Sequence, residues 1–147
     1  MHWQRTFLHP MLTNFDAPSR DECVADRTIS NSPQQALTLL NDPVFVEACH
    51  AFAVRLMTEH PDADVETWIS SGFQIAISRD ASQAERQALE KLYEKQLEYF
   101  QSNPDETRAF ISVGPIRDDA KVDSAKSAAL AQVCRVILNL HETITRY

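Results

Sequence analysis

The scarcity of glycine is the feature that most constrains what this chain can fold into. Only two glycines, Gly72 and Gly114, occur among its 147 residues. Tight β-hairpins and phosphate-cradling loops rely on glycine, because it adopts a positive φ without steric cost. Hydrophobic residues make up 44% of the chain and charged residues 24%, as in ordinary globular domains. The sequence therefore predicts a single all-α domain, long enough to bury a core.

Two helix starts lie unusually close together in the stretch SNSPQQALTLLNDPVFVEACHAF. Ser32 and Asp42 are each followed directly by a proline. A serine or aspartate side chain can accept an unpaired backbone N–H of the first helical turn, and proline presets φ at the first helical position. We therefore predict one helix over residues 33–40 and a second from residue 43 to about residue 60.

Further helices are expected along the rest of the chain. Ser82 and Glu85 form a capping-box pattern, and Asn103 precedes a proline. The apolar run ALAQVCRVILNL predicts a helix that is buried in the middle of a bundle. The expected ranges are 65–77, 82–102, 104 to before Gly114, and 123 or 124 onward. Together these segments predict a compact bundle of about five or six helices.

Residues 1–31 differ from the rest because their apolar residues follow no sustained period. Pro10 and Pro18 interrupt the segment. We expect an irregular N-terminal arm over residues 1–31 that packs on a helical domain over residues 32–147. The aromatic content of the arm is too high for a solvated tail.

The charge and the cysteines bear on several classes of function. The net charge of −7 and the lack of a basic stripe argue against a nucleic-acid partner. The sequence contains no apolar run of about 18 residues, so no membrane span is expected. Cys23, Cys49 and Cys134 form no CxxC pair, which argues against a zinc ribbon and a thioredoxin-type motif.

Glu47 and His50 are weak candidates for metal ligands because they form an ExxH pattern. A carboxylate-bridged metal pair needs a second ExxH, and the sequence has no second copy. The same stretch, VEACH, has Val46 where a covalent haem motif, CxxCH, has its first cysteine. We therefore expect no cofactor in this chain, with Cys49 in the core and His50 on a solvated helix surface.

The arm carries the candidates for catalysis, namely Asp16, Arg20, Asp21 and Cys23. Polar residues in an irregular segment between fixed elements often carry function. Cys23 could act as a nucleophile if a histidine came within hydrogen-bond reach. The alternative is that this cluster makes exposed ion pairs and turns. Whether the chain is an enzyme stays open at this point, and the lack of a recognised catalytic motif favours a chain without activity of its own.

The segments FDAPSRDEC, SPQQALTLLND and LNLHETITR carry a resemblance to a known family. With them the chain resembles the C-terminal part of a planctomycete-type surface-protein domain of unknown function. This domain occurs in large bacterial proteins, often with a cytochrome c-like module. The resemblance implies that the chain is a fragment of a larger periplasmic or cell-surface protein, with covalent haem on an upstream domain of that protein.

The same resemblance implies that the arm has lost neighbouring residues. Trp3, Phe7 and Met11 would then form an exposed apolar patch that contacts the rest of the parent polypeptide or favours self-association. Three functions remain open. The first is a non-catalytic helical C-terminal module of the multidomain protein. The second is part of an active site that the upstream half completes, and the third is a stand-alone helical adaptor for protein interaction.

Overall fold

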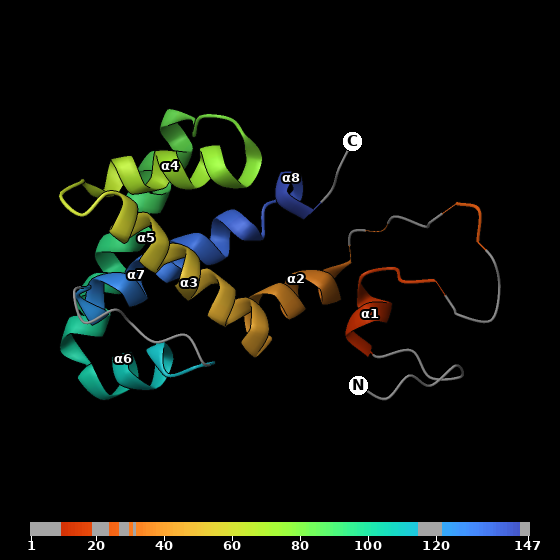
Figure 1. Ribbon diagram of the computed structural model, residues 1–147, viewed down its shortest axis with the longest axis horizontal. Helices are drawn as coiled ribbons and strands as arrows, with labels where there is room; N and C mark the ends of the chain where they lie inside the picture. The colour runs from red at the N-terminus through yellow and green to blue at the C-terminus, as the bar shows by residue number, and fades with distance from the viewer. Residues whose placement is uncertain (1–9, 19–23, 27–29, 31, 115–121, 145–147) are drawn as a thin grey trace.

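The computed structural model describes residues 10–18, 24–26, 30, 32–114 and 122–144 of the chain. No β-strand occurs in these ranges, so the prediction of an all-α fold is confirmed. The helices, drawn in Figure 1, are α1 (Pro10–Asn14), α2 (Pro33–Asn41), α3 (Pro43–Glu59), α4 (Val65–Ile77), α5 (Gln83–Ser102), α6 (Pro104–Ile111), α7 (Ser124–Leu138) and α8 (His141–Ile144). None of these described helices is long and apolar enough to cross a membrane.

Helix α7 lies at the centre of the fold, as its apolar sequence predicts. It packs most extensively against α3 and α5 and also contacts α2, α4, α6 and α8. Figure 1 shows it running between α3 and α5. Eight of its residues are buried, and four of these are serine or alanine. Such small side chains let neighbouring helix backbones approach closely, which explains how one helix can contact so many other helices.

The predicted helix starts are confirmed by their hydrogen bonds. The hydroxyl of Ser32 accepts the backbone N–H of Gln35 at 3.3 Å, and the Gln35 side chain accepts the N–H of Ser32 at 3.1 Å. Asp42 accepts the N–H of Val44 at 3.0 Å. Ser82 and Glu85 form the reciprocal capping box expected for α5. The capping residues therefore fix the starts of α2, α3 and α5.

Three local predictions differ from the structure. Asn103 makes no capping bond to α6, because its side-chain amide instead donates to the carbonyl of Tyr99 at 2.8 Å. The arm is not irregular throughout, since Pro10 occupies the first position of α1, where its fixed φ suits a helix. The last expected helix, from residue 123 or 124 onward, ends at Leu138, and His141–Ile144 form a separate short helix, α8.

Arg79, which follows the end of α4, makes ion pairs with one residue at the start of α5 and one residue of α8. Its guanidinium donates to Glu85 at 2.7 Å and to Glu142 at 2.7 Å. The carbon at the centre of the guanidinium also lies 5.1 Å from the centroid of the Phe73 ring. These bonds connect residues that are far apart in the sequence and hold the C-terminal helix against the rest of the fold.

The molecule has two regions, a bundle and a limb. We use "bundle" for α3–α8 and "limb" for α1, α2 and the described residues 15–18 and 30 between them. In Figure 1 the limb projects from one side of the bundle. Helix α2 contacts α1, α3 and α7. The core of the fold lies in the bundle, because every buried hydrophobic residue in the described part of the chain belongs to α3, α4, α5, α7 or the connection before α5.

Candidate functional site

Asp16, a candidate for catalysis, holds the turn of the limb together. It follows α1 with a positive φ of 53°. Its carboxylate accepts the backbone N–H of Ser30 at 2.7 Å, the Ser30 hydroxyl at 2.8 Å, and the side-chain amide of Gln35 at 3.3 Å. The bonds from Ser30 lower the pKa of Asp16, with a smaller contribution from Gln35. A carboxylate that is held ionised in this way is a weak base, so the geometry gives Asp16 a structural role.

The other candidates in the arm, Arg20, Asp21 and Cys23, lie outside the described residues, so a site there stays a prediction. Trp3 and Phe7 of the expected apolar patch also lie outside the described residues. Met11 is described and is half-buried. The arm thus contributes one described candidate residue, Asp16, and that residue bonds to other parts of the limb.

The expectation that His50 lies on a solvated helix surface is wrong. Its side chain is 1% exposed, and its ring meets the Phe110 ring edge-on at 6.2 Å between centroids. Helix α3 is covered by α7 on one side and by Phe110 of α6 on another, which makes its buried face broader than the apolar stripe indicates. His50 therefore belongs to the core beside Cys49, which is buried as predicted.

Glu47 lies one turn before His50 and is half-buried beside Gly114. A Cβ atom added to Gly114 would lie 2.2 Å from Cδ of Glu47, so the flexible end of the Glu47 side chain would have to move to make room for it. Gly114 also has a φ of +83°, which favours glycine. Within the described ranges, no group of three or more His, Cys, Asp or Glu side chains is arranged to hold a metal ion.

The thiols of Cys49 and Cys134 are buried and free. Burial raises the pKa of Cys49 to about 11, against a smaller opposing effect of Arg135. Burial, with a smaller contribution from Cys49, also raises the pKa of Cys134 well above its ordinary value. The thiolate is the nucleophilic form of cysteine, and both thiols stay protonated near neutral pH. Neither residue is therefore suited to nucleophilic catalysis.

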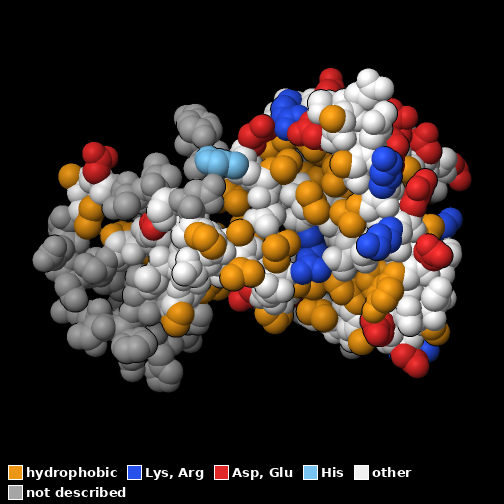
Figure 2. Space-filling model, turned by 180° about the vertical axis from the view of Figure 1, so that it is seen from behind, with side chains coloured by type: hydrophobic (Ala, Val, Ile, Leu, Met, Phe, Trp, Pro, Cys, Tyr) orange, Lys and Arg blue, Asp and Glu red, His pale blue; other side chains and the backbone are white. Residues whose placement is uncertain are grey.

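The limb has an unusual surface. The three most exposed large hydrophobic residues of the described chain are Val44 at 63%, Leu37 at 58% and Val24 at 51%, all in or beside the limb. Helices α1 and α2 carry no charged residue, whereas each of the other described helices carries at least one. In Figure 2, charged side chains gather mainly over the bundle, and hydrophobic ones gather where the limb meets it. An apolar surface without charges is typical of the core of a protein interface.

A family model described as PSD1, protein of unknown function (DUF1553), matches residues 1–93, which is more than half of the chain. The chain belongs to the DUF1553 family. The resemblance to a domain of unknown function is thereby confirmed, whereas its planctomycete and cytochrome associations stay predictions. No curated protein and no solved structure matches the chain.

The DUF1553 match covers the limb, α3, α4 and the first part of α5. It therefore includes the charge-free helices, Asp16, Glu47 and His50. The likeness of the C-terminal segment LNLHETITR to the same family lies beyond residue 93 and stays a prediction. Sequence reasoning missed the limb surface, although its signal was present: residues 30–41 contain no charged side chain.

Proposed function

We propose that this DUF1553 chain is a non-catalytic helical module that docks through its limb onto another domain of a larger bacterial polypeptide. The observation that carries the proposal is the surface of α1 and α2, which carry no charged residue and expose Leu12 and Leu37. Charged side chains are depleted at the centre of protein interfaces, because their desolvation costs free energy. Isolated exposed hydrophobic residues are common, but here Leu12 and Leu37 lie on the two helices that lack charge, and Val44 lies close by in the first turn of α3.

The size of the limb favours a partner within the same polypeptide. Helix α2 has nine residues and is therefore about 14 Å long. A surface of this length buries far less than the roughly 1,000 Å² that a stable association of separate proteins requires. A covalent link raises the effective concentration of a neighbouring domain to about the millimolar range, so that a small interface is sufficient.

The charge of the chain also argues against a second copy as the partner. Each copy carries a net charge of −7, so two copies repel one another. We expect the partner surface to be neutral and apolar, with polar groups at its edge that bond to side chains such as Gln34 and Asn41. The family resemblance extends this proposal to an exported parent protein in which a cytochrome c-like domain, upstream of this chain, carries the haem.

The proposal is tested by photo-crosslinking in the polypeptide as its cells make it. A benzophenone amino acid at Leu37 probes the limb, and the same group at Gln87, an exposed residue of α5, is the matched control. We expect the probe at position 37 to form an intramolecular cross-link to a segment outside the present sequence, identified by mass spectrometry. The control is expected to form little of this product.

Three results would overturn the proposal. The first is a cross-link between two copies of this chain at position 37, which identifies self-association. The second is a yield at position 37 no higher than at position 87. The third is a native polypeptide of only 16.7 kDa, the mass of this chain, which would favour the stand-alone adaptor.

A further inference from the structure

Among the described residues, a long-range hydrogen bond joins the end of α2 to α7. A terminal nitrogen of the Arg135 guanidinium donates to the backbone carbonyl of Leu40, a residue 95 positions earlier. Its other terminal nitrogen donates to the side chain of Gln132 at 2.6 Å. The last carbonyls of a helix have no partner within the helix, and a cation near them is favourable because the helix dipole is negative there. Arg135 therefore caps α2 from the bundle.

One residue, Asp42, separates α2 from α3. Its backbone N–H donates to the carbonyl of Thr38 at 2.9 Å, which ends α2, and its carboxylate accepts the N–H of Val44, which starts α3. Asp42 itself has an extended conformation, with φ −69° and ψ 130°. The two helices therefore change direction at one residue, and a rotation there would move α2 without breaking either helix.

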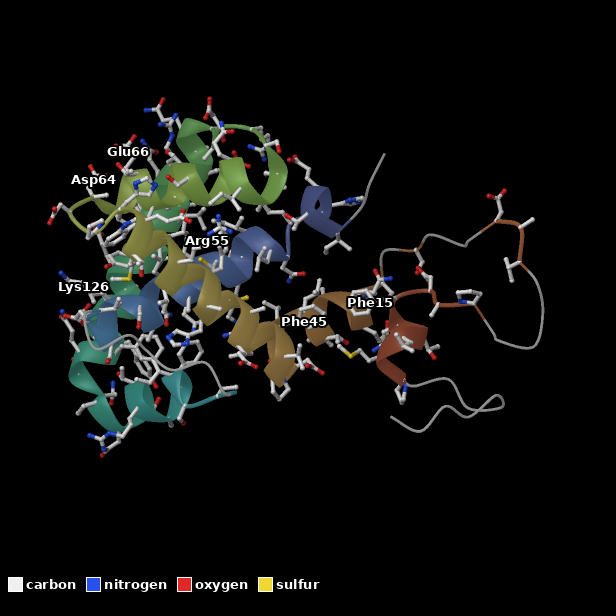
Figure 3. The ribbon with its side chains drawn as sticks, in the orientation of Figure 1. Phe15, Phe45, Arg55, Asp64, Glu66 and Lys126 are labelled. Atoms are coloured by element: carbon white, nitrogen blue, oxygen red, sulfur yellow. The ribbon has the colours of Figure 1, made fainter. Side chains whose placement is uncertain are left out.

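The limb has bonds of its own that hold it as a unit. The side-chain amide of Asn14 in α1 donates to the hydroxyl of Thr38 in α2 at 3.1 Å. Asp16 joins Ser30 to Gln35 through its carboxylate. Between the limb and the bundle, the described residues make one aromatic contact, in which the ring centroids of Phe15 and Phe45 are 6.0 Å apart (Figure 3).

The junction between limb and bundle leaves one hydrogen-bonding group unused. Nε of Arg135, the residue that bonds to Leu40, is buried and has no hydrogen-bond partner among the described residues. A buried donor or acceptor without a partner is destabilising, and it is hydrated when the surrounding surface opens. The junction therefore gains hydration on opening that a fully bonded interface would not gain.

We propose that Arg135 is a latch and Asp42 a hinge: the limb swings as a unit when the bond from Arg135 to Leu40 breaks. The bundle keeps its core during this motion, because no buried hydrophobic residue belongs to the limb. The motion would let the limb adjust to the surface on which it docks. That consequence rests on the proposed function, whereas the motion itself follows from the contacts of this chain.

Pulsed electron-electron resonance on the full chain tests the latch. Spin labels are attached through non-canonical amino acids, so that the native cysteines are retained. The pair at Gln34 and Gln87 reports on limb and bundle, and the pair at Lys126 and Gln87 reports on the bundle alone. All three residues are exposed. The distance distribution of each pair is compared between the wild-type chain and Arg135→Gln.

Arg135→Gln loses one charge-assisted hydrogen bond. We expect this loss to raise about tenfold the population of molecules in which the distance between the labels at positions 34 and 87 differs from its main wild-type value. The 126–87 distance stays unchanged. An unaltered 34–87 distribution in Arg135→Gln, or equal broadening of both pairs, would overturn the latch. If this variant does not fold, the wild-type chain in urea below its unfolding midpoint gives the same readout. The 34–87 pair must then broaden at lower urea concentrations than the 126–87 pair. These results do not depend on whether the limb forms the proposed cross-link to a neighbouring domain.

Discussion

The bundle and the limb are stabilised in different ways. The bundle has α7 at its centre, with Leu130, Val133 and Cys134 fully buried between α3 and α5. The limb contains a single buried residue, Gln35, and depends on caps and side-chain hydrogen bonds. Short helices are marginal in water unless tertiary contacts support them. We therefore expect the bundle to be the more stable region and the limb to open at a lower free energy.

The largest difference between the two regions is expected when the same substitution, leucine to alanine, is made in each and the free energy of unfolding is compared. Leu130→Ala in α7 removes a side chain that is 0% exposed and should lower the free energy of unfolding by about 3 kcal/mol. Leu37→Ala in α2 removes one that is 58% exposed and should lower it by less than about 0.5 kcal/mol. Urea denaturation followed by circular dichroism measures both. Equal losses would show that the limb is part of the same core.

Removal of the N-caps gives the next largest effect. Ser82→Ala removes the capping hydroxyl of α5 and should destabilise the whole bundle by about 1 kcal/mol. Ser32→Ala removes the same group from α2 and should leave the unfolding midpoint of the bundle nearly unchanged. It should, however, speed hydrogen exchange of the α2 amides. If Ser32→Ala lowers the midpoint as much as Ser82→Ala, the two regions unfold together and the distinction fails.

The contact between Phe15 and Phe45 allows the energetic coupling between limb and bundle to be measured. A double-mutant cycle with Phe15→Ala and Phe45→Ala should give a coupling energy of about 0.5–1.5 kcal/mol, as for other aromatic pairs. The coupling should appear in the exchange of the limb amides and be much weaker in global unfolding. Coupling of similar size in global unfolding would mean that the contact contributes to the bundle core.

Titration with acid compares the two regions through the pKa of one carboxylate in each, Glu85 in the bundle and Asp16 in the limb. Hydrogen bonds from Arg79, and then from Ser82, lower the pKa of Glu85 to about 2 from an ordinary value of 4.5. The bonds from Ser30 lower the pKa of Asp16 below its ordinary value of 3.8. A carboxyl group with a lowered pKa in the folded state contributes stability above its unfolded pKa. That contribution is lost as the pH falls through the folded pKa.

Carboxyl-carbon NMR titration checks the two pKa values separately. Arg79→Gln should raise the pKa of Glu85 towards 4.5, and Ser30→Ala should raise that of Asp16 towards 3.8. Neither substitution should shift the carboxylate in the other region. A change in the pKa of Glu85 caused by Ser30→Ala would mean that the limb and the Arg79 contacts are coupled, so that the two regions are not independent.

The sequence predicted those parts of the fold that depend on local rules. Ser32, Asp42 and Ser82 cap helices as expected, because a cap depends on residues within a few positions of one another. The central place of α7 followed from its apolar run. The exception was Asn103, whose side chain bonds to an earlier carbonyl instead of the next helix.

Contacts between residues that are far apart in the sequence could not be predicted from local sequence patterns. The bond from Arg135 to Leu40 joins residues 95 positions apart, and nothing near either residue indicates it. The burial of His50 depends on Phe110, which comes from α6. Of the candidate site, the sequence could have revealed the charge-free helices but not the exposure of Leu37 and Val44, which depends on how the limb lies against the bundle.

Native-state hydrogen exchange of the wild-type chain, measured at increasing urea concentrations below the midpoint, tests the distinction between bundle and limb most directly. We expect the amides of α2 to exchange through an opening of lower free energy than those of α7, with little dependence on urea, because a small surface is exposed. The amides of α3, α5 and α7 should exchange only with global unfolding. Exchange of α2 and α7 amides with one free energy and one urea dependence would contradict the distinction.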